Sequence, residues 1–258
     1  MASKEHGNSL GDAYRRWRGS LLGRITDRRE AELIDELMGD VQGLDVLDVG
    51  CGDGALMASI SYKGANVTGV DPDDAMLAAA RQRAEASGLS FHLLSGSAEA
   101  LPFADCSFDR IVGVTVLCFI EKPDIAIAEM ARVLRPGGEI ILGELGKTNI
   151  WAAVRRIKGW LGSPVWRAAR FRNAAELRRL LTRRGLRTCT VRGAIFYPPI
   201  GLAAMAMGAI DNWLGRHLTE GAAFIAIKAQ KGPERSLANS SFRSMRTAEQ
   251  YSATLAAG

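Results

Sequence analysis

A ten-residue run at positions 45–54 constrains the fold of this chain more than any other part of its sequence. It reads DVLDVGCGDG, an apolar run with an acidic residue near its end, followed by glycines spaced G-x-G-x-G. The apolar run predicts a buried strand, and the glycines predict a tight turn whose backbone a ligand can approach closely. The spacing differs from the G-x-G-x-x-G of pyrophosphate-binding dehydrogenases, so a dehydrogenase is disfavoured.

Short strand-like runs alternate with helical stretches through the first half of the chain. The runs lie at 44–49, 66–71, 91–96, 108–114 and 139–144. The helical stretches lie at 54–63, 73–87 and 123–134. This alternation predicts βαβ units and a parallel sheet covered by helices on both faces. Two further strands are expected at 186–192 and 222–230.

Helix signals flank this core. Thr26 is a plausible N-cap for a helix that ends at Gly39, and Asn173 with Glu176 has the capping-box pattern. An apolar helix is expected at about 202–217.

Composition sets the domain limits. We expect one domain at 13–230, preceded by a flexible arm at 1–12 and followed by a disordered tail at 231–258, which is polar and rich in serine.

No signal-peptide pattern opens the chain, which favours a cytoplasmic location. Prolines and glycines interrupt the uncharged stretch at 193–210, so no membrane-spanning helix is predicted. The four cysteines have no metal-ligand spacing and predict buried free thiols.

Charge is distributed unevenly along the chain. The formal net charge is +5, but residues 151–192 carry twelve Lys or Arg and one acid, a local balance of +11. By subtraction, the remainder carries −6. The asymmetry predicts a basic face near whatever the second half binds.

Four motifs in order resemble the class I S-adenosylmethionine (SAM) dependent methyltransferases. They are the glycine turn preceded by Asp48, Asp71 in GVDPDDAML, the run SGSAEALPFADCSFDRIV at 95–112, and RPGG before the fifth strand. The branch that it resembles most contains the ubiquinone and menaquinone biosynthesis C-methyltransferases. The resemblance implies a Rossmann-like, doubly wound α/β fold with a seven-stranded mixed sheet, an antiparallel last strand and a helical cap. It also implies SAM as cofactor, with a cofactor half at 44–145 and an acceptor half at 146–230.

The resemblance also assigns cofactor-binding residues. Asp48 would organise the turn and attract the positively charged end of the methionine moiety, Asp71 would hold the ribose hydroxyls, and Ala98 would present its backbone to the adenine. The full set is Asp48, Gly50, Cys51, Gly52, Gly54, Asp71, Pro72, Met76, Ser97, Ala98 and Thr115.

Two departures from the family pattern concern adenine and the acceptor. Ser97 stands where the family has an aspartate that commonly binds the adenine amino group. Cys118 and Phe119 stand where the quinone branch usually has histidines, which weakens any transfer of its substrate. Methyl transfer needs no metal and often no strong base. Glu144, at the end of the fifth strand, is the candidate base, and a structural carboxylate is the alternative.

The sequence therefore predicts methyl transfer to a small-molecule acceptor of lipophilic or anionic character. The alternatives are a non-catalytic SAM-binding or interaction protein with a methyltransferase fold, and a methyltransferase that acts at an anionic membrane surface. Tryptophans interleave with cations in the basic segment, which leaves four interpretations: an anion-binding cap, contact with an anionic membrane, nucleic-acid binding, or a solvated helix pair. Nucleic acid is least favoured, because the chain lacks the [ND]PP[YF] motif of enzymes that methylate exocyclic amines. The segments 146–172 and 193–220 are hypothesised to form a lid over the acceptor site.

Overall fold

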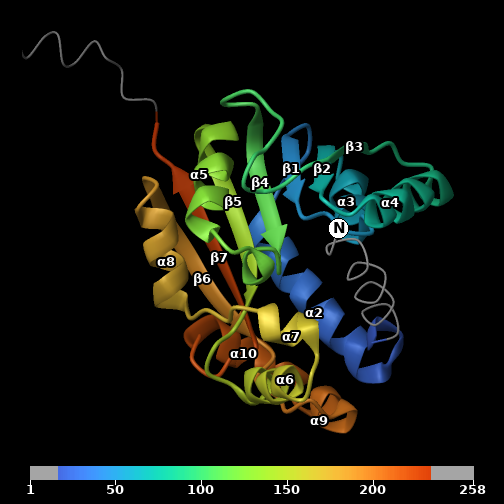
Figure 1. Cartoon of the computed structure of the whole chain (residues 1–258), viewed down its shortest axis with the longest axis vertical. Helices are drawn as coiled ribbons and strands as arrows, with labels where there is room; N and C mark the ends of the chain where they lie inside the picture. The colour runs from blue at the N-terminus through green and yellow to red at the C-terminus, as the bar shows by residue number, and fades with distance from the viewer. Residues whose placement is uncertain (1–16, 234–258) are drawn as a thin grey trace, which may run out of the picture.

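A seven-stranded sheet forms the centre of the computed structural model, which describes residues 17–233 (Figure 1). The strand order is β3-β2-β1-β4-β5-β7-β6. The strands are β1 (Asp45–Val49), β2 (Asn66–Asp71), β3 (His92–Ser95), β4 (Phe108–Val114), β5 (Leu134–Leu145), β6 (Leu186–Ala194) and β7 (Phe224–Lys231). β7 runs antiparallel to both of its neighbours, whereas the pairs formed by β1 to β5 are parallel. The predicted mixed sheet with an antiparallel last strand is confirmed.

Helices cover both faces of this sheet. On one face α5 (Pro123–Val133) and α8 (Ala174–Thr182) pack against the strands, and on the other α2 (Leu21–Met38), α3 (Ala55–Tyr62) and α4 (Asp74–Ser87) do so. β1 shows why two cores form, because successive side chains of a strand point to opposite faces. Val46 is buried against the second group of helices and Leu47 against the first.

The remaining helices gather at the lower end of the molecule in Figure 1. They are α6 (Ile150–Trp160), α7 (Pro164–Ala168), α9 (Gly201–Ala206) and α10 (Gly208–His217). A short 3₁₀ turn, η1 (Leu117–Phe119), follows β4. Within residues 17–233 no helix is both long and apolar enough to cross a bilayer.

The structure corrects the predicted start of the first long helix. Ser20, not Thr26, is the N-cap of α2, and its hydroxyl accepts a hydrogen bond from the Gly23 amide at 3.0 Å. Thr26 lies inside the helix and is fully buried, with its hydroxyl 3.3 Å from that of Tyr197. The Thr26 hydroxyl therefore contacts a distant residue, whereas the hydroxyl of an N-cap accepts a hydrogen bond from an amide of its own helix.

The predicted helix at 202–217 is also wrong as a continuous element. It is broken into α9 and α10 at Met207, immediately before Gly208. Glycine is a poor helix former, and a Cβ at this position would lie 2.7 Å from the Arg29 guanidinium. The break lets α10 pack against β6.

Two smaller differences complete the comparison with the sequence. β5 begins at Leu134, so the predicted RPGG turn lies within the strand's bounds. Cys106 and Cys189 are exposed rather than buried, while Cys51 and Cys118 are buried as predicted. The predicted arm at 1–12 and nearly all of the predicted tail lie outside the described residues.

Candidate active site

The glycine turn leaves β1 at the carboxyl edge of the sheet. The amides of Gly50 and Cys51 both donate to the Val70 carbonyl, at 2.8 and 3.2 Å, which ties the turn to β2. Gly52 has φ +53°, and a Cβ built on it meets no atom within 4 Å. Its backbone therefore faces open space in a conformation that favours glycine, so a ligand can lie against it.

Gly54 is required for a different reason. It has φ +73° as the N-cap of α3, and a Cβ there would lie 3.0 Å from the Cβ of Ala80 and 3.2 Å from the ring of Phe91. Gly54 thus lets α3 and α4 pack closely. The spaced glycines serve two ends, an open backbone and a tight helix start.

Asp71 ends β2 and holds the turn from the neighbouring strand. Its Oδ2 accepts a hydrogen bond from the Gly52 amide and its Oδ1 accepts one from the Asp73 amide, both at 2.9 Å. Burial raises the pKa of Asp71, and the two backbone hydrogen bonds oppose that rise. Each carboxylate oxygen can accept a further bond, so the geometry is compatible with hydroxyl groups at Asp71. Its role toward ribose stays a prediction.

Asp48 lies buried beneath the turn. Its side chain is 2% exposed, and burial together with the Asp71 charge raises its pKa to about 7. Two neighbouring carboxyl groups with raised pKa values favour any ligand that brings positive charge, because that charge stabilises their ionised forms. The pair thus fits the ammonium and sulfonium groups of SAM.

The other predicted cofactor residues lie at or near this edge of the sheet. Ala98 is buried, Met76 is half-buried and Pro72 is exposed. Ser97 is exposed, and its hydroxyl accepts a hydrogen bond from the Glu99 amide at 3.2 Å. That hydroxyl is thus partly engaged within its own loop. The roles of these residues toward the cofactor stay predictions.

Thr115 follows β4 in a conformation that non-glycine residues rarely adopt, with φ +55°. Its amide donates to the Gly143 carbonyl at 2.6 Å, and its own carbonyl accepts the Cys118 thiol at 3.0 Å. Such strain is common at ligand sites. It adds a physical argument to the prediction that Thr115 contacts the cofactor.

Glu144, the candidate base, is 1% exposed near the end of β5. Its Oε1 accepts a hydrogen bond from the Leu117 amide at 2.8 Å, whereas its buried Oε2 has no hydrogen-bond partner among residues 17–233. Burial raises the pKa of Glu144 to about 7, against the lowering effects of the Leu117 amide and the Arg172 charge. The contact ties turn η1 to β5, and the role of Glu144 in catalysis stays a prediction.

The segment after β5 folds back over this edge. The Arg170 amide donates to the Cys118 carbonyl at 2.8 Å, and the Arg172 guanidinium donates to the Leu117 carbonyl at 2.9 Å. The end of the 146–172 segment therefore rests on turn η1. Its role as a lid over the acceptor site stays a prediction.

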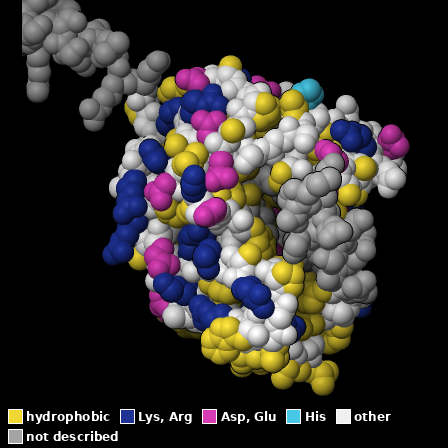
Figure 2. Space-filling model, in the orientation of Figure 1, with side chains coloured by type: hydrophobic (Ala, Val, Ile, Leu, Met, Phe, Trp, Pro, Cys, Tyr) yellow, Lys and Arg dark blue, Asp and Glu magenta, His cyan; other side chains and the backbone are white. Residues whose placement is uncertain are grey.

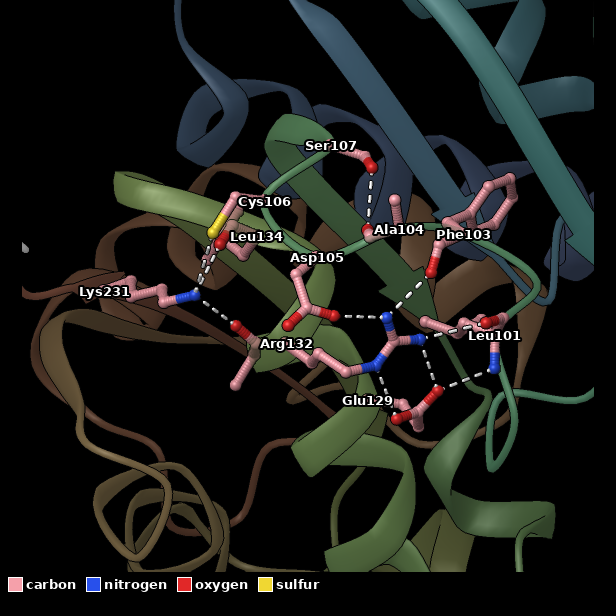
Figure 3. A network of polar contacts seen from close by, with 11 residues as sticks. Leu101, Phe103, Ala104, Asp105, Cys106, Ser107, Glu129, Arg132, Leu134 and Lys231 are labelled. Carbon is pink, nitrogen blue, oxygen red and sulfur yellow. Dashed lines mark hydrogen bonds and ion pairs between the residues drawn. The ribbon is translucent and has the colours of Figure 1, made fainter.

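Sequence reasoning missed a cluster centred on Arg132 of α5 (Figure 3). Its guanidinium donates to the carbonyls of Leu101 and Phe103, at 3.0 and 2.7 Å, and to the carboxylates of Asp105 and Glu129, each at 2.8 Å. Glu129 in turn accepts the Leu101 amide at 2.9 Å, and the Arg132 side chain lowers the pKa of Glu129. The cluster fixes the loop that follows Ala98. The only local signal for it was the i, i+3 spacing of Glu129 and Arg132.

Comparison with known proteins places this geometry in a family. The family described as "Methyltransferase domain" matches residues 47–142. A ubiquinone biosynthesis O-methyltransferase from Rhizobium leguminosarum is 32% identical over 165 residues, which are 62% of this chain and 65% of the relative. An uncharacterised protein of Mycobacterium tuberculosis is 30% identical over 84% of this chain and 70% of its own length.

Solved structures agree. A SAM-dependent methyltransferase from Thermotoga maritima superposes with a TM-score of 0.65 and 25% identity, covering 85% of this chain and 95% of the other. The chain belongs to the class I SAM-dependent methyltransferases. Magnesium protoporphyrin IX methyltransferase from Synechocystis, solved with bound S-adenosylhomocysteine (SAH), has the same fold, with a TM-score of 0.65 and 20% identity over 89% of this chain and 98% of the other.

Membership of this methyltransferase family makes SAM the cofactor. The residues present fit it, because the open backbone at Gly52 and the buried pair of Asp48 and Asp71 suit a ligand with positive charge and hydroxyl groups. Within residues 17–233 no group of three or more His, Cys, Asp or Glu side chains could hold a metal ion. The Rhizobium enzyme is matched over just under two thirds of its length.

Proposed function

We propose that this methyltransferase passes the methyl group of SAM by direct displacement to a small-molecule acceptor that is lipophilic or anionic. The observation that carries the proposal is the bond from the Gly52 amide to Asp71, which joins the two predicted cofactor motifs in one place. The buried carboxyl of Asp48 beside it supplies negative charge for the cofactor's cationic end.

The chain's own residues position the two reactants and enclose the site. The turn at Gly52 and the carboxylate of Asp71 bind the cofactor, and turn η1 with the 146–172 segment encloses the acceptor. When bound, SAM supplies a methyl group on a sulfonium, which leaves as a neutral thioether. A lone pair of the acceptor forms the new bond to carbon, and the acceptor's proton passes to solvent. Holding the two reactants in line supplies much of the rate, because it removes the entropic cost of their encounter.

Two further observations support the proposed acceptor class. Several relatives are ubiquinone biosynthesis O-methyltransferases, which makes an oxygen atom on a lipophilic molecule the first acceptor to test. The cations between Trp151 and Arg192 favour an acceptor that also carries a phosphate or carboxylate. The lid formed by 146–172 and 193–220 would exclude water from an acceptor of either kind, lipophilic or anionic.

A matched pair of glycine variants tests the cofactor site. Gly52 and Gly88 both have positive φ, +53° and +63°, and both have open space for a Cβ. Substitution by alanine therefore strains the backbone to a similar degree, by about 1 kcal/mol. Calorimetry should show micromolar binding of SAM and SAH to the wild type and to Gly88→Ala, and at least tenfold weaker binding to Gly52→Ala. Equal affinities for the two variants would place the cofactor elsewhere.

Turnover separates the enzyme from a non-catalytic binding protein. Cell extract incubated with the protein and SAM carrying an isotope-labelled methyl group should yield a labelled small molecule by mass spectrometry. SAM binding without any labelled product from any extract would favour the binding protein. Cell fractionation tests the predicted cytoplasmic location.

A further inference from the structure

Large apolar side chains are exposed together at one end of the molecule. Trp160 and Leu161 at the end of α6 are each 82% exposed, and Leu202 and Met205 of α9 are 76% and 61% exposed. Figure 2 shows hydrophobic side chains running without a break across this end, where Figure 1 places α6 and α9. We call these four residues, together with Leu21 and Ile157, the apolar tip. Exposed apolar groups gathered in one place mark an interaction surface.

The apolar tip is held on a rigid base. The buried Trp151 of α6 donates its indole N–H to the Tyr197 carbonyl at 2.8 Å, which fixes α6 to the chain entering α9. A Cβ on Gly201 would lie 3.4 Å from Leu21, so the start of α2 adjoins α9. The exposed side chains therefore come from three elements that the fold holds in place.

Positive charge prevails in the two segments that carry most of the apolar tip. Residues 150–170 contain five Lys or Arg and no acid. Lys158, Arg167 and Arg170 are exposed, and their side chains form no ion pair within the described part of the chain. In residues 200–218 the one acid, Asp211, is 2% exposed and accepts the amides of Ile195 and Phe196. No exposed carboxylate of these two segments opposes a negatively charged partner.

This combination identifies the partner. We propose that the apolar tip docks on the surface of an anionic lipid bilayer, with Trp160 and Leu161 at the boundary between headgroups and acyl chains. A helical surface with an apolar centre and basic rim binds in this way, through buried apolar area and attraction to anionic headgroups. In a twofold dimer through the same surface, the cationic rims would face one another and repel.

Docking on a bilayer would also serve the proposed function. The bilayer binding itself does not depend on the proposed function. The last residues of the 146–172 segment, Arg170 and Arg172, rest on turn η1, and its middle carries Ile157, Trp160 and Leu161 of the apolar tip. A lipophilic acceptor could then pass from the bilayer to the site along one segment.

Vesicle flotation with the full chain tests the proposal without SAM. Vesicles of phosphatidylcholine with one third phosphatidylglycerol should carry the protein at physiological salt, and pure phosphatidylcholine vesicles should not. The double variant Trp160→Ser, Leu161→Ser should bind at least tenfold more weakly, since apolar burial at the bilayer is lost. Tyr62→Ser is the matched control, because Tyr62 is 67% exposed on α3, outside the apolar tip.

A second pair tests the charge. Lys158→Ala should weaken binding about fivefold, the effect of one cation at an anionic surface, whereas Arg178→Ala on α8 should not. Retained SAM binding and an unchanged circular dichroism spectrum show that each variant is folded. Absence of binding to the anionic vesicles would overturn the proposal. So would equal losses from Lys158→Ala and Arg178→Ala, or a wild-type dimer in solution that the Trp160, Leu161 variant dissociates.

Discussion

The buried carboxyl of Glu144 gives the structure a prediction with a defined pH dependence. Its pKa is about 7 in the folded protein and 4.5 ordinarily, so the folded state holds a proton that the unfolded state releases between these values. Stability from this group is therefore complete below pH 4.5 and falls as the pH rises toward 7. At about 1.4 kcal/mol for each pH unit, the loss has an upper limit of about 3 kcal/mol.

The substitution Glu144→Gln removes this dependence. Glutamine keeps an oxygen for the Leu117 amide and stays neutral at every pH. The difference in unfolding free energy, variant minus wild type, should therefore increase by about 1–3 kcal/mol between pH 5 and pH 8. Urea denaturation at both pH values measures it. Glu121→Gln, which changes an exposed carboxyl, should show no comparable increase.

Two outcomes would refute the reasoning. A difference that is constant or decreases toward pH 8 would mean that Glu144 is ionised in the fold and paired with Arg172. The second outcome concerns catalysis. If Glu144 only holds turn η1 in place, Glu144→Gln should keep turnover within about threefold of the wild type. A fall of a hundredfold or more, restored at no pH, would instead identify Glu144 as the general base.

Three further predictions follow from the contacts. Asp71→Ala should weaken SAM binding by about 1.5–3 kcal/mol, the effect of losing hydrogen bonds to a charged group; unchanged affinity in calorimetry would mean that another residue holds the ribose. Asn173→Ala should lower the free energy of unfolding by about 1 kcal/mol, because it removes the cap of α8, and a change below 0.3 kcal/mol in urea denaturation would contradict the roughly 1 kcal/mol that such a cap contributes. Arg132→Lys should lower the free energy of unfolding by about 1–3 kcal/mol and speed proteolysis within residues 101–107, because a lysine cannot make the several hydrogen bonds of the planar guanidinium. An unchanged digestion pattern would show that other contacts hold this loop.

The sequence by itself determined the elements whose signals are local. β2 and β4 have the predicted bounds, because β-branched residues within each strand carry the signal locally. The capping box of α8 is present as predicted, since Asn173 and Glu176 are three residues apart and need no distant partner. The family motifs are also short local patterns, which lie between residues 45 and 138, so the fold class and the cofactor could be predicted from the sequence.

Tertiary structure decided the residues whose partners are distant in the chain. Thr26 has the sequence pattern of a cap, but it is buried beside Tyr197, 171 residues away. Glu144, the candidate base, accepts a hydrogen bond from the Leu117 amide, 27 residues earlier, and no local pattern indicated this contact. Arg132 holds a loop about 30 residues before it. In each case a buried polar group must find a partner, and the sequence pattern does not say which distant residue the fold brings within hydrogen-bond reach.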